Sequence, residues 1–99
     1  MIVIEGAIDL ATLPTLRDEL SRAVYRHRGL TLLVDLDGVT VLDDIGLGVL
    51  LGAAGAARQS GGELEVVCSL PSLIRRFALT GLDRAIAVRQ RVTPSDPTR

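Results

Sequence analysis

Two adjacent carboxylates, Asp43 and Asp44, stand directly before a segment rich in glycine and alanine, "GLGVLLGAAGAA". The segment has the pattern of a helix, and a carboxylate at a helix N-terminus accepts hydrogen bonds from free backbone N–H groups and opposes the helix dipole. One acid is enough for that role. The other is therefore predicted to face the groove beyond the carboxyl end of the preceding strand, where open α/β sheets place their binding sites.

Glycine recurs through this segment at Gly46, Gly48, Gly52 and Gly55. Each interior glycine costs about 0.5–1 kcal/mol relative to alanine, so four of them need a reason. Close packing against the sheet is the favoured reason for any single glycine. The alternative is that one face of the helix admits the backbone of a partner, and the two can hold on opposite faces. A charged loop beside a helix of little bulk predicts a surface that docks another protein.

Other groups that could do chemistry receive simpler interpretations. Asp35 and Asp37, together with the acidic pair, suggest a magnesium site like that of phosphoacceptor receiver domains, but such a site also needs a lysine and the chain has none. These acids are interpreted as solvated turn residues, and no metal is expected. His27 is predicted to lie at a helix C-terminus, where cations are favoured. Cys68 ends an apolar strand and is interpreted as a small core residue.

Enzymatic function is not expected. The sequence contains no Ser-His-Asp order, CxxC pair or P-loop, and the absence of lysine excludes Schiff-base chemistry, so no cofactor is predicted. A net charge of −1 and an aromatic content of 2% argue against nucleic-acid binding. No apolar run approaches the roughly 20 residues that span a bilayer, and the N-terminus lacks the basic region of a signal peptide. The single cysteine suits a reducing compartment, so a cytoplasmic location is predicted.

The elements that must position these residues alternate between strand and helix. Strands are predicted at 2–5, 30–36, 63–68 and 85–90, and helices from Thr12 to Gly29, from the acidic pair to Gly61, and over 71–81. The strand at 30–36 is apolar at nearly every position, which is typical of a strand covered on both faces, and "DGVT" after it is predicted to turn. The order β-α-β-α-β-α-β predicts an α/β fold with a mostly parallel sheet of about four strands and three helices packed on it. Residues 1–92 are predicted to form a single domain, and the tail at 93–99, which contains two prolines, is predicted to fray.

A long central stretch, "VDLDGVTVLDDIGLGVLLGAAGAARQSGGELEVV", resembles the core of the STAS domain found in bacterial anti-sigma factor antagonists. The stretches "GAIDLATLPTL" and "PSLIRRFALTGLDRAI" are similar too, and the resemblance runs in order over residues 2–90. It implies a STAS-like fold that lacks the family's usual extra first strand and last helix. Both omissions would leave sheet edge or apolar surface uncovered, and either a homodimer or a start codon assigned too late would account for that.

The resemblance implies a partner. Antagonists of this family bind an anti-sigma factor, usually a histidine-kinase-like ATPase, and thereby free a sigma factor for transcription. The matching positions imply a partner-binding surface on this chain at Asp9, Asp43, Asp44, Ile45, Gly46, Leu47 and Gly48.

The same resemblance raises a question of control, because the kinase phosphorylates a hydroxyl residue directly before Gly-Leu-Gly and this chain has Ile45 there. Asp44 replaces a serine, and capping accounts for it without any role as a phosphate mimic. Three hypotheses follow: an antagonist that is always competent, a switch displaced to another hydroxyl such as Thr40, or a scaffold whose partner is not a kinase. Protein binding without phosphorylation at position 45 is the favoured one.

Two further functions remain as alternatives. Some stand-alone STAS proteins are similar to accessory subunits of ABC-type transport ATPases, which would make a transporter the partner. A nucleotide-binding sensor could use the helix N-terminus to hold phosphate, but two carboxylates there would repel it, so this alternative ranks last.

Overall fold

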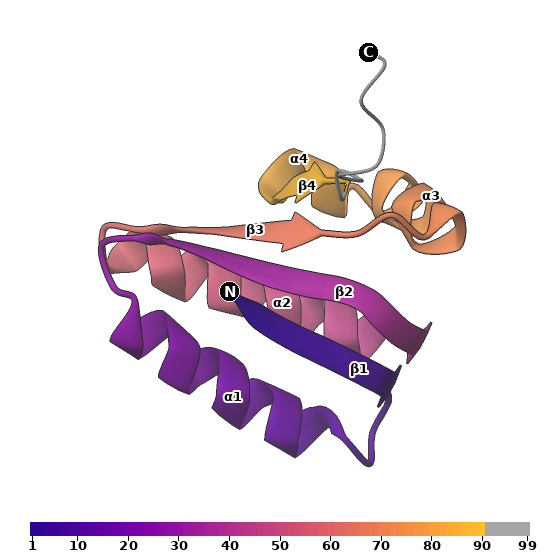
Figure 1. Ribbon diagram of the computed structural model, residues 1–99, viewed down its shortest axis with the longest axis horizontal. Coiled ribbons are helices and arrows are strands. Elements are labelled where there is room, and N and C mark those ends of the chain that lie inside the picture. Colours follow the sequence, from indigo (N-terminus) through magenta and orange to yellow (C-terminus); the bar gives the residue numbers. More distant parts are fainter. Residues whose placement is uncertain (91–99) are drawn as a thin grey trace, which may run out of the picture.

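Strands and helices alternate along the chain as the sequence predicts. The computed structural model describes residues 1–90, and the predicted frayed tail at 93–99 lies outside the described residues. The elements, in chain order, are β1 (Ile2–Ile8), α1 (Leu13–Arg26), β2 (Thr31–Leu42), α2 (Asp44–Gln59), β3 (Glu63–Val67), α3 (Pro71–Thr80), α4 (Leu82–Ala85) and β4 (Ala87–Arg89) (Figure 1). The one-turn helix α4 was not predicted.

The sheet has four strands in the order β1-β2-β3-β4, and every neighbouring pair is parallel. Each crossover therefore moves one strand further in the same direction. Right-handed crossovers that all step the same way place their helices on the same face of a sheet. The prediction of a mostly parallel α/β sheet of about four strands is confirmed.

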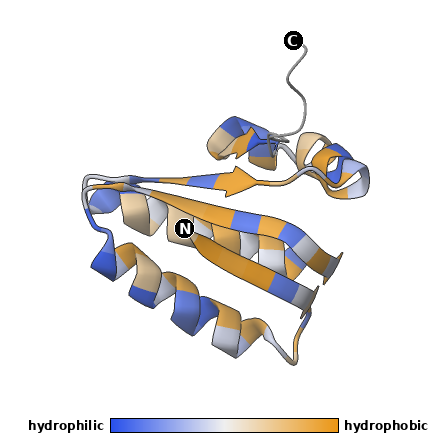
Figure 2. Ribbon diagram, viewed as in Figure 1, coloured by the Kyte–Doolittle hydropathy of each residue, from blue (hydrophilic) through white to orange (hydrophobic). Residues whose placement is uncertain are grey.

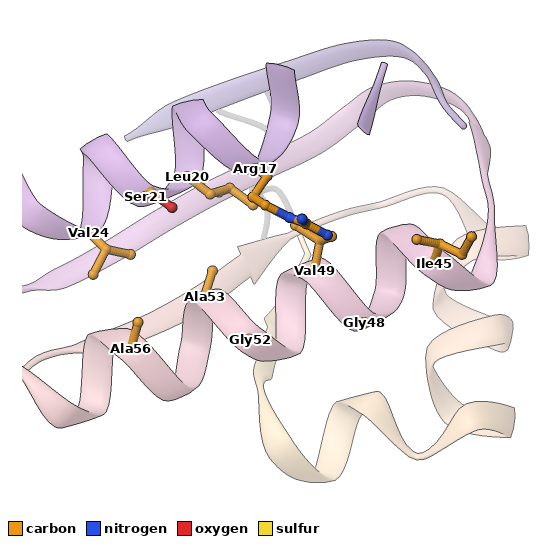
Figure 3. Close-up of a pocket in the computed structure, with 10 residues that line it drawn as sticks. All are labelled: Arg17, Leu20, Ser21, Val24, Ile45, Gly48, Val49, Gly52, Ala53 and Ala56. Carbon is orange, nitrogen blue, oxygen red and sulfur yellow. The ribbon is translucent and has the colours of Figure 1, made fainter. Parts of the chain in front are cut away.

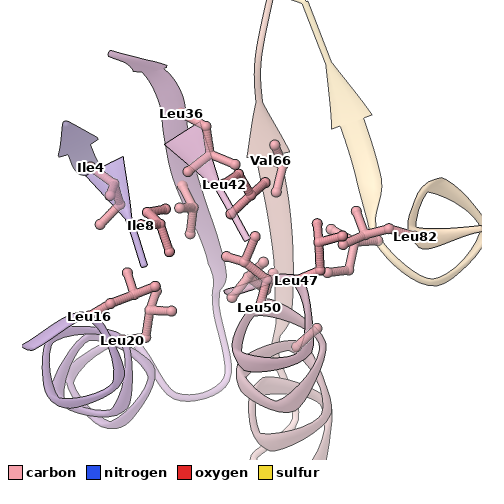
Figure 4. Close-up of a cluster of buried hydrophobic side chains, with 14 of the residues drawn as sticks. Ile4, Ile8, Leu16, Leu20, Leu36, Leu42, Leu47, Leu50, Val66 and Leu82 are labelled. Atoms are coloured by element: carbon pink, nitrogen blue, oxygen red, sulfur yellow. The ribbon is translucent and has the colours of Figure 1, made fainter. Parts of the chain in front are cut away.

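The helices accordingly cover one face, and α1 and α2 lie side by side on it (Figure 4). Ile4, Leu36 and Val66 point into this interface and are buried, whereas Val3 on the opposite face is 54% exposed. The described helices therefore cover one face of the strand at 30–36, although Asp35 on its other face is 4% exposed. The apolar Leu33 of this strand is only half-buried.

The core forms where the apolar residues of the helices meet the covered face of the sheet. Figure 2 shows how hydrophobic residues predominate along β1, β2 and β3. Helix α1 contributes leucines at helical spacing, including Leu16 and Leu20, and α2 contributes Leu50 and Ala54, both fully buried. Phe77 of α3 closes the same cluster at 1% exposure. A chain with almost no aromatic residues thus fills its core with aliphatic side chains.

Strand β2 is longer than predicted and continues through "DGVT" to Leu42. Its pairing with β1 shifts twice, because Val3 pairs with Asp35 but Glu5 pairs with Gly38, and Ala7 pairs with Val41. The predicted turn is therefore wrong: the extra residues are absorbed as bulges in a strand whose apolar residues keep it against the core. Strand β1 likewise passes Gly6, its predicted end, which adopts a φ of +83° at the second shift.

Candidate functional site

The N-terminus of α2 is fixed by its backbone. The Asp43 N–H donates to the carbonyl of Ile8 at the end of β1 (3.0 Å), and the Asp43 carbonyl accepts from the N–H of Gly46 (2.9 Å). Neither Asp43 nor Asp44 caps the helix through its side chain. The prediction that one of these carboxylates caps α2 is therefore wrong, and both side chains are exposed at the helix start.

Asp44 instead reaches across to α3. Its Oδ1 lies 2.5 Å from Nη2 of Arg76, and the Asp44 side chain is 88% exposed while that of Arg76 is 32% exposed. An ion pair this open to solvent contributes about 0–1 kcal/mol, so its main effect is to place a cation beside the loop. Arg76, on α3, is thus part of this region. Asp43 is left as the carboxylate of the pair without an ion pair among residues 1–90.

The loop residues after the acids divide into two groups. Ile45 is 49% exposed and Gly48 is exposed. Leu47 is 5% exposed, and Gly46 is buried so tightly that a Cβ on it would come within 2.6 Å of Cγ2 of Ile8. Of the predicted partner-binding residues, Gly46 and Leu47 therefore do not face solvent. They hold the loop against the core.

The remaining glycines of α2 do not pack against the sheet. A Cβ built on Gly48, Gly52 or Gly55 would meet nothing within 4 Å. Close packing, the favoured interpretation of each single glycine, is therefore correct for Gly46 and wrong for these three. They give α2 an outer surface of low bulk.

Two hollows flank the start of α2. One is a groove of about 600 Å³ between α1 and α2, and Ile45 and Gly48 are among the residues that line it (Figure 3). The other, of about 620 Å³, lies between the end of β2 and α3 and contains both acids with Thr40 and Arg76. Thr40 is exposed and shares this hollow with Asp44, so the hydroxyl singled out from the sequence does lie close to the loop.

Asp9 lies in the turn between β1 and α1, next to Ile8, whose carbonyl binds the α2 N-terminus. Its Oδ1 accepts hydrogen bonds from the N–H groups of Ala11 (3.0 Å) and Thr12 (3.2 Å). Thr12 precedes α1 as predicted, but its hydroxyl donates backwards to the carbonyl of Ala7 and does not cap the helix. The carboxylate of Asp9 therefore has a structural task.

The other predicted chemical groups lie away from this surface. Asp35 is 4% exposed, so its interpretation as a solvated turn residue is wrong: its Oδ1 accepts from the N–H of Asp37 (2.9 Å). Asp37 in turn accepts from the N–H of Ser69 (2.5 Å). Cys68 is fully buried, and this burial is the main cause that raises the pKa of its thiol. His27 is exposed at the end of α1.

Within residues 1–90, no three His, Cys, Asp or Glu side chains gather closely enough to hold a metal ion. Over the same residues, no helix combines the length and the apolar character that a membrane-spanning segment needs.

The sequence and the fold match known proteins. The model of the STAS domain family matches residues 1–94. The chain belongs to the STAS domain family. This STAS protein is 36% identical over 89 residues to the anti-sigma-B factor antagonist of Listeria monocytogenes. The alignment covers 89% of this chain and 76% of that protein. The chain is 34% identical over 85 residues to the anti-sigma-B factor antagonist of Bacillus subtilis, covering 86% of this chain and 76% of the relative.

A solved structure agrees. The crystal structure of an anti-sigma factor antagonist from Mycobacterium paratuberculosis matches with a TM-score of 0.78 and 29% identity, over 95% of this chain and 77% of that chain. The resemblance and the STAS fold are confirmed, and the chain is a homologue of anti-sigma factor antagonists. These relatives are named for a regulatory role, in agreement with the expectation that the chain is not an enzyme.

Sequence reasoning missed two features of the region. Arg17, on α1, lines the groove beside Ile45, and Arg76 pairs with Asp44. The local sequence could not predict the contact between α3 and the start of α2, because this contact depends on how the helices of two successive crossovers pack against each other. Arg17 carried a signal that was available, since it falls one turn before the buried Leu20.

Proposed function

We propose that this protein is an anti-sigma factor antagonist that binds an anti-sigma factor through the start of α2 and so releases a sigma factor in the cytoplasm. The contact surface, called here the α2 surface, consists of Asp43, Asp44, Ile45 and Gly48. The observation that carries the proposal is that these four residues face solvent at a fixed helix N-terminus. It is supported by homology to proteins named as antagonists of anti-sigma factors.

The chemistry of the α2 surface favours a protein partner. The free carboxylate of Asp43 offers a charge contact, Ile45 offers exposed apolar area, and Gly48 leaves room for the backbone of a partner. Asp9 is included because of its position. It stabilises the turn directly after Ile8, whose carbonyl accepts a hydrogen bond from the start of α2. A histidine-kinase-like ATPase is the class of anti-sigma factor proposed.

Binding experiments with purified anti-sigma factors encoded in the same genome test the α2 surface. Calorimetry should show that Asp43→Lys and Gly48→Trp weaken binding at least about tenfold, the equivalent of 1.4 kcal/mol. Asp18→Lys on α1 and Gly55→Trp further along α2 are matched controls, because both positions lie outside the surface. Gly55→Trp is expected to fold, since a Cβ there meets nothing within 4 Å. Equal affinity for wild type and the two surface variants would disprove the proposal.

We propose that no kinase controls this protein by phosphorylation at position 45, because Ile45 has no oxygen to accept a phosphate. A phosphate would add about −1.5 to −2 charges beside two carboxylates. Incubation with ATP and the cognate kinase should leave the intact mass unchanged, whereas Ile45→Ser should gain one phosphate. A phosphate located on Thr40 by mass spectrometry would replace the always-competent antagonist with a displaced switch.

A further inference from the structure

The groove between α1 and α2, called here the α1–α2 groove, has the size of a small-molecule site. Its volume of about 600 Å³ lies within the range of roughly 300–1,000 Å³ that is usual for ligand pockets. Helix α1 lines one side and α2 the other (Figure 3). The lining residues are Arg17, Leu20, Ser21, Val24, Ile45, Gly48, Val49, Gly52, Ala53 and Ala56.

The groove is apolar and owes its depth to missing side chains. Leu20 and Val24 of α1 are 1% and 9% exposed and form its base together with the half-buried Val49 and Ala53. On the α2 side, a Cβ at Gly52 would meet nothing within 4 Å, so the wall is open where another residue would fill it. A linear apolar group could therefore lie in this groove, alongside both helices.

Charge is confined to one point of the groove. Arg17 is the charged residue among the ten that line it, and no ion pair joins Arg17 to any other of residues 1–90. Its side chain extends from α1 across the groove toward Val49 (Figure 3). A guanidinium in this place is complementary to a carboxylate, which it can bind through two parallel N–H···O bonds. Ser21, one turn further along α1, offers a hydroxyl beside it.

We propose that the α1–α2 groove binds a medium-chain fatty acid, with its carboxylate on Arg17 and its alkyl chain along Val49 and Ala53. One cation in a groove whose other lining residues are apolar, apart from Ser21, matches the two parts of such a molecule. The distance along α1 from Arg17 to Val24 is about 10 Å at a rise of 1.5 Å per residue, which suits a chain of medium length. The site needs no anti-sigma factor and is tested on the purified chain alone.

Decanoate, kept below its micelle concentration, is the probe. Titration followed by calorimetry and by amide NMR shifts should show saturable binding of one decanoate per chain, with the shifts concentrated on α1 and α2. Gly52→Leu fills the groove and should abolish this binding. Gly55→Leu makes the same chemical change at a glycine that is equally open but does not line the groove, so it should bind decanoate as the wild type does.

The head group is tested separately. Arg17→Gln should weaken decanoate binding about threefold, the size expected of an exposed ion pair, and should leave the affinity for uncharged decanol unchanged. Arg22→Gln, on the same helix but outside the groove, should leave both affinities unchanged.

Several results would overturn the proposal. Absence of saturable decanoate binding to the wild type would do so, as would equal binding by Gly52→Leu. Sedimentation could also show a wild-type dimer that Gly52→Leu, but not Gly55→Leu, converts to a monomer. If decanoate did not shift that equilibrium, the groove would hold a second copy of the chain and not a fatty acid.

Discussion

Glycine serves opposite purposes at two positions of α2, Gly46 and Gly52. At Gly46 a Cβ would lie 2.6 Å from Cγ2 of Ile8 and 2.9 Å from Cδ1 of Leu42, so the missing side chain lets the helix approach β1 and β2. At Gly52 the same atom would meet nothing within 4 Å. The sequence alone could not distinguish the tightly packed glycine from the open one, because both are glycines in the same predicted helix.

Alanine substitution should therefore have opposite effects at the two positions. Gly46→Ala should lower the free energy of unfolding by about 1–3 kcal/mol, the usual cost of overpacking a core. Gly52→Ala should raise it by about 0.5–1 kcal/mol, because alanine favours the helix and finds free space. Urea denaturation of the two variants measures both changes. If Gly46→Ala proved as stable as Gly52→Ala, the tight contact between α2 and Ile8 would be wrong.

Cys68 gives the fold a sensitivity to alkaline pH. Burial is the main cause that raises the pKa of its thiol in the folded chain, with a smaller raising effect from Asp37 and an opposing backbone hydrogen bond from Leu70. As pH rises, the thiol ionises first in the unfolded chain. The contribution of Cys68 to stability is therefore complete below the pKa of the unfolded chain, about 8.5, and is lost as pH rises through the pKa of the folded chain. Unfolding free energies at pH 7.5 and pH 10 should fall more steeply for wild type than for Cys68→Val. Parallel pH profiles would contradict this assignment.

At the scale of elements, the sequence marks where helices begin but not which atoms hold their ends. The acids before α2 indicate a helix start correctly, yet the backbone of Asp43 makes the bonds there and neither side chain does. Before α1, Thr12 stands at the N-cap position but makes no side-chain cap, and the carboxylate of Asp9 binds the turn instead. Such choices depend on rotamers and on the exit angle of β1, which residue type does not specify.

Removing these two carboxylates should separate a structural acid from a surface acid. Asp9→Ala deletes the acceptor of two backbone N–H groups and should lower stability by about 1–2 kcal/mol. Asp43→Ala deletes no side-chain hydrogen bond and should cost about 0.5 kcal/mol or less, through the helix dipole alone. Thermal unfolding of both variants at equal ionic strength checks the order. An Asp43→Ala variant less stable than Asp9→Ala would show that Asp43 caps α2 after all.

At the scale of the whole molecule, the alternation of strands and helices was enough to predict a parallel α/β sheet. It was not enough to predict that, among residues 1–90, the helices cover only one face of the sheet. That outcome follows from the strand order β1-β2-β3-β4, which the chain sets by docking and not by local pattern. The near-continuous apolar run in β2 favoured two covered faces, but Asp35 within it lies in register with Val3 and Val67 on the face that no helix of residues 1–90 covers.

Two adjacent residues of β1 test this one-sided arrangement, because successive side chains of a strand point to opposite faces. Val3 is 54% exposed and Ile4 is 7% exposed. Val3→Thr should change the free energy of unfolding by no more than about 0.5 kcal/mol, as for other surface substitutions. Ile4→Thr keeps the β-branched shape but removes buried methyl area and buries a hydroxyl, so it should cost about 2 kcal/mol or more. Equal losses of unfolding free energy in the two threonine variants would show that Val3 is as buried as Ile4, and the one-sided arrangement would then be wrong.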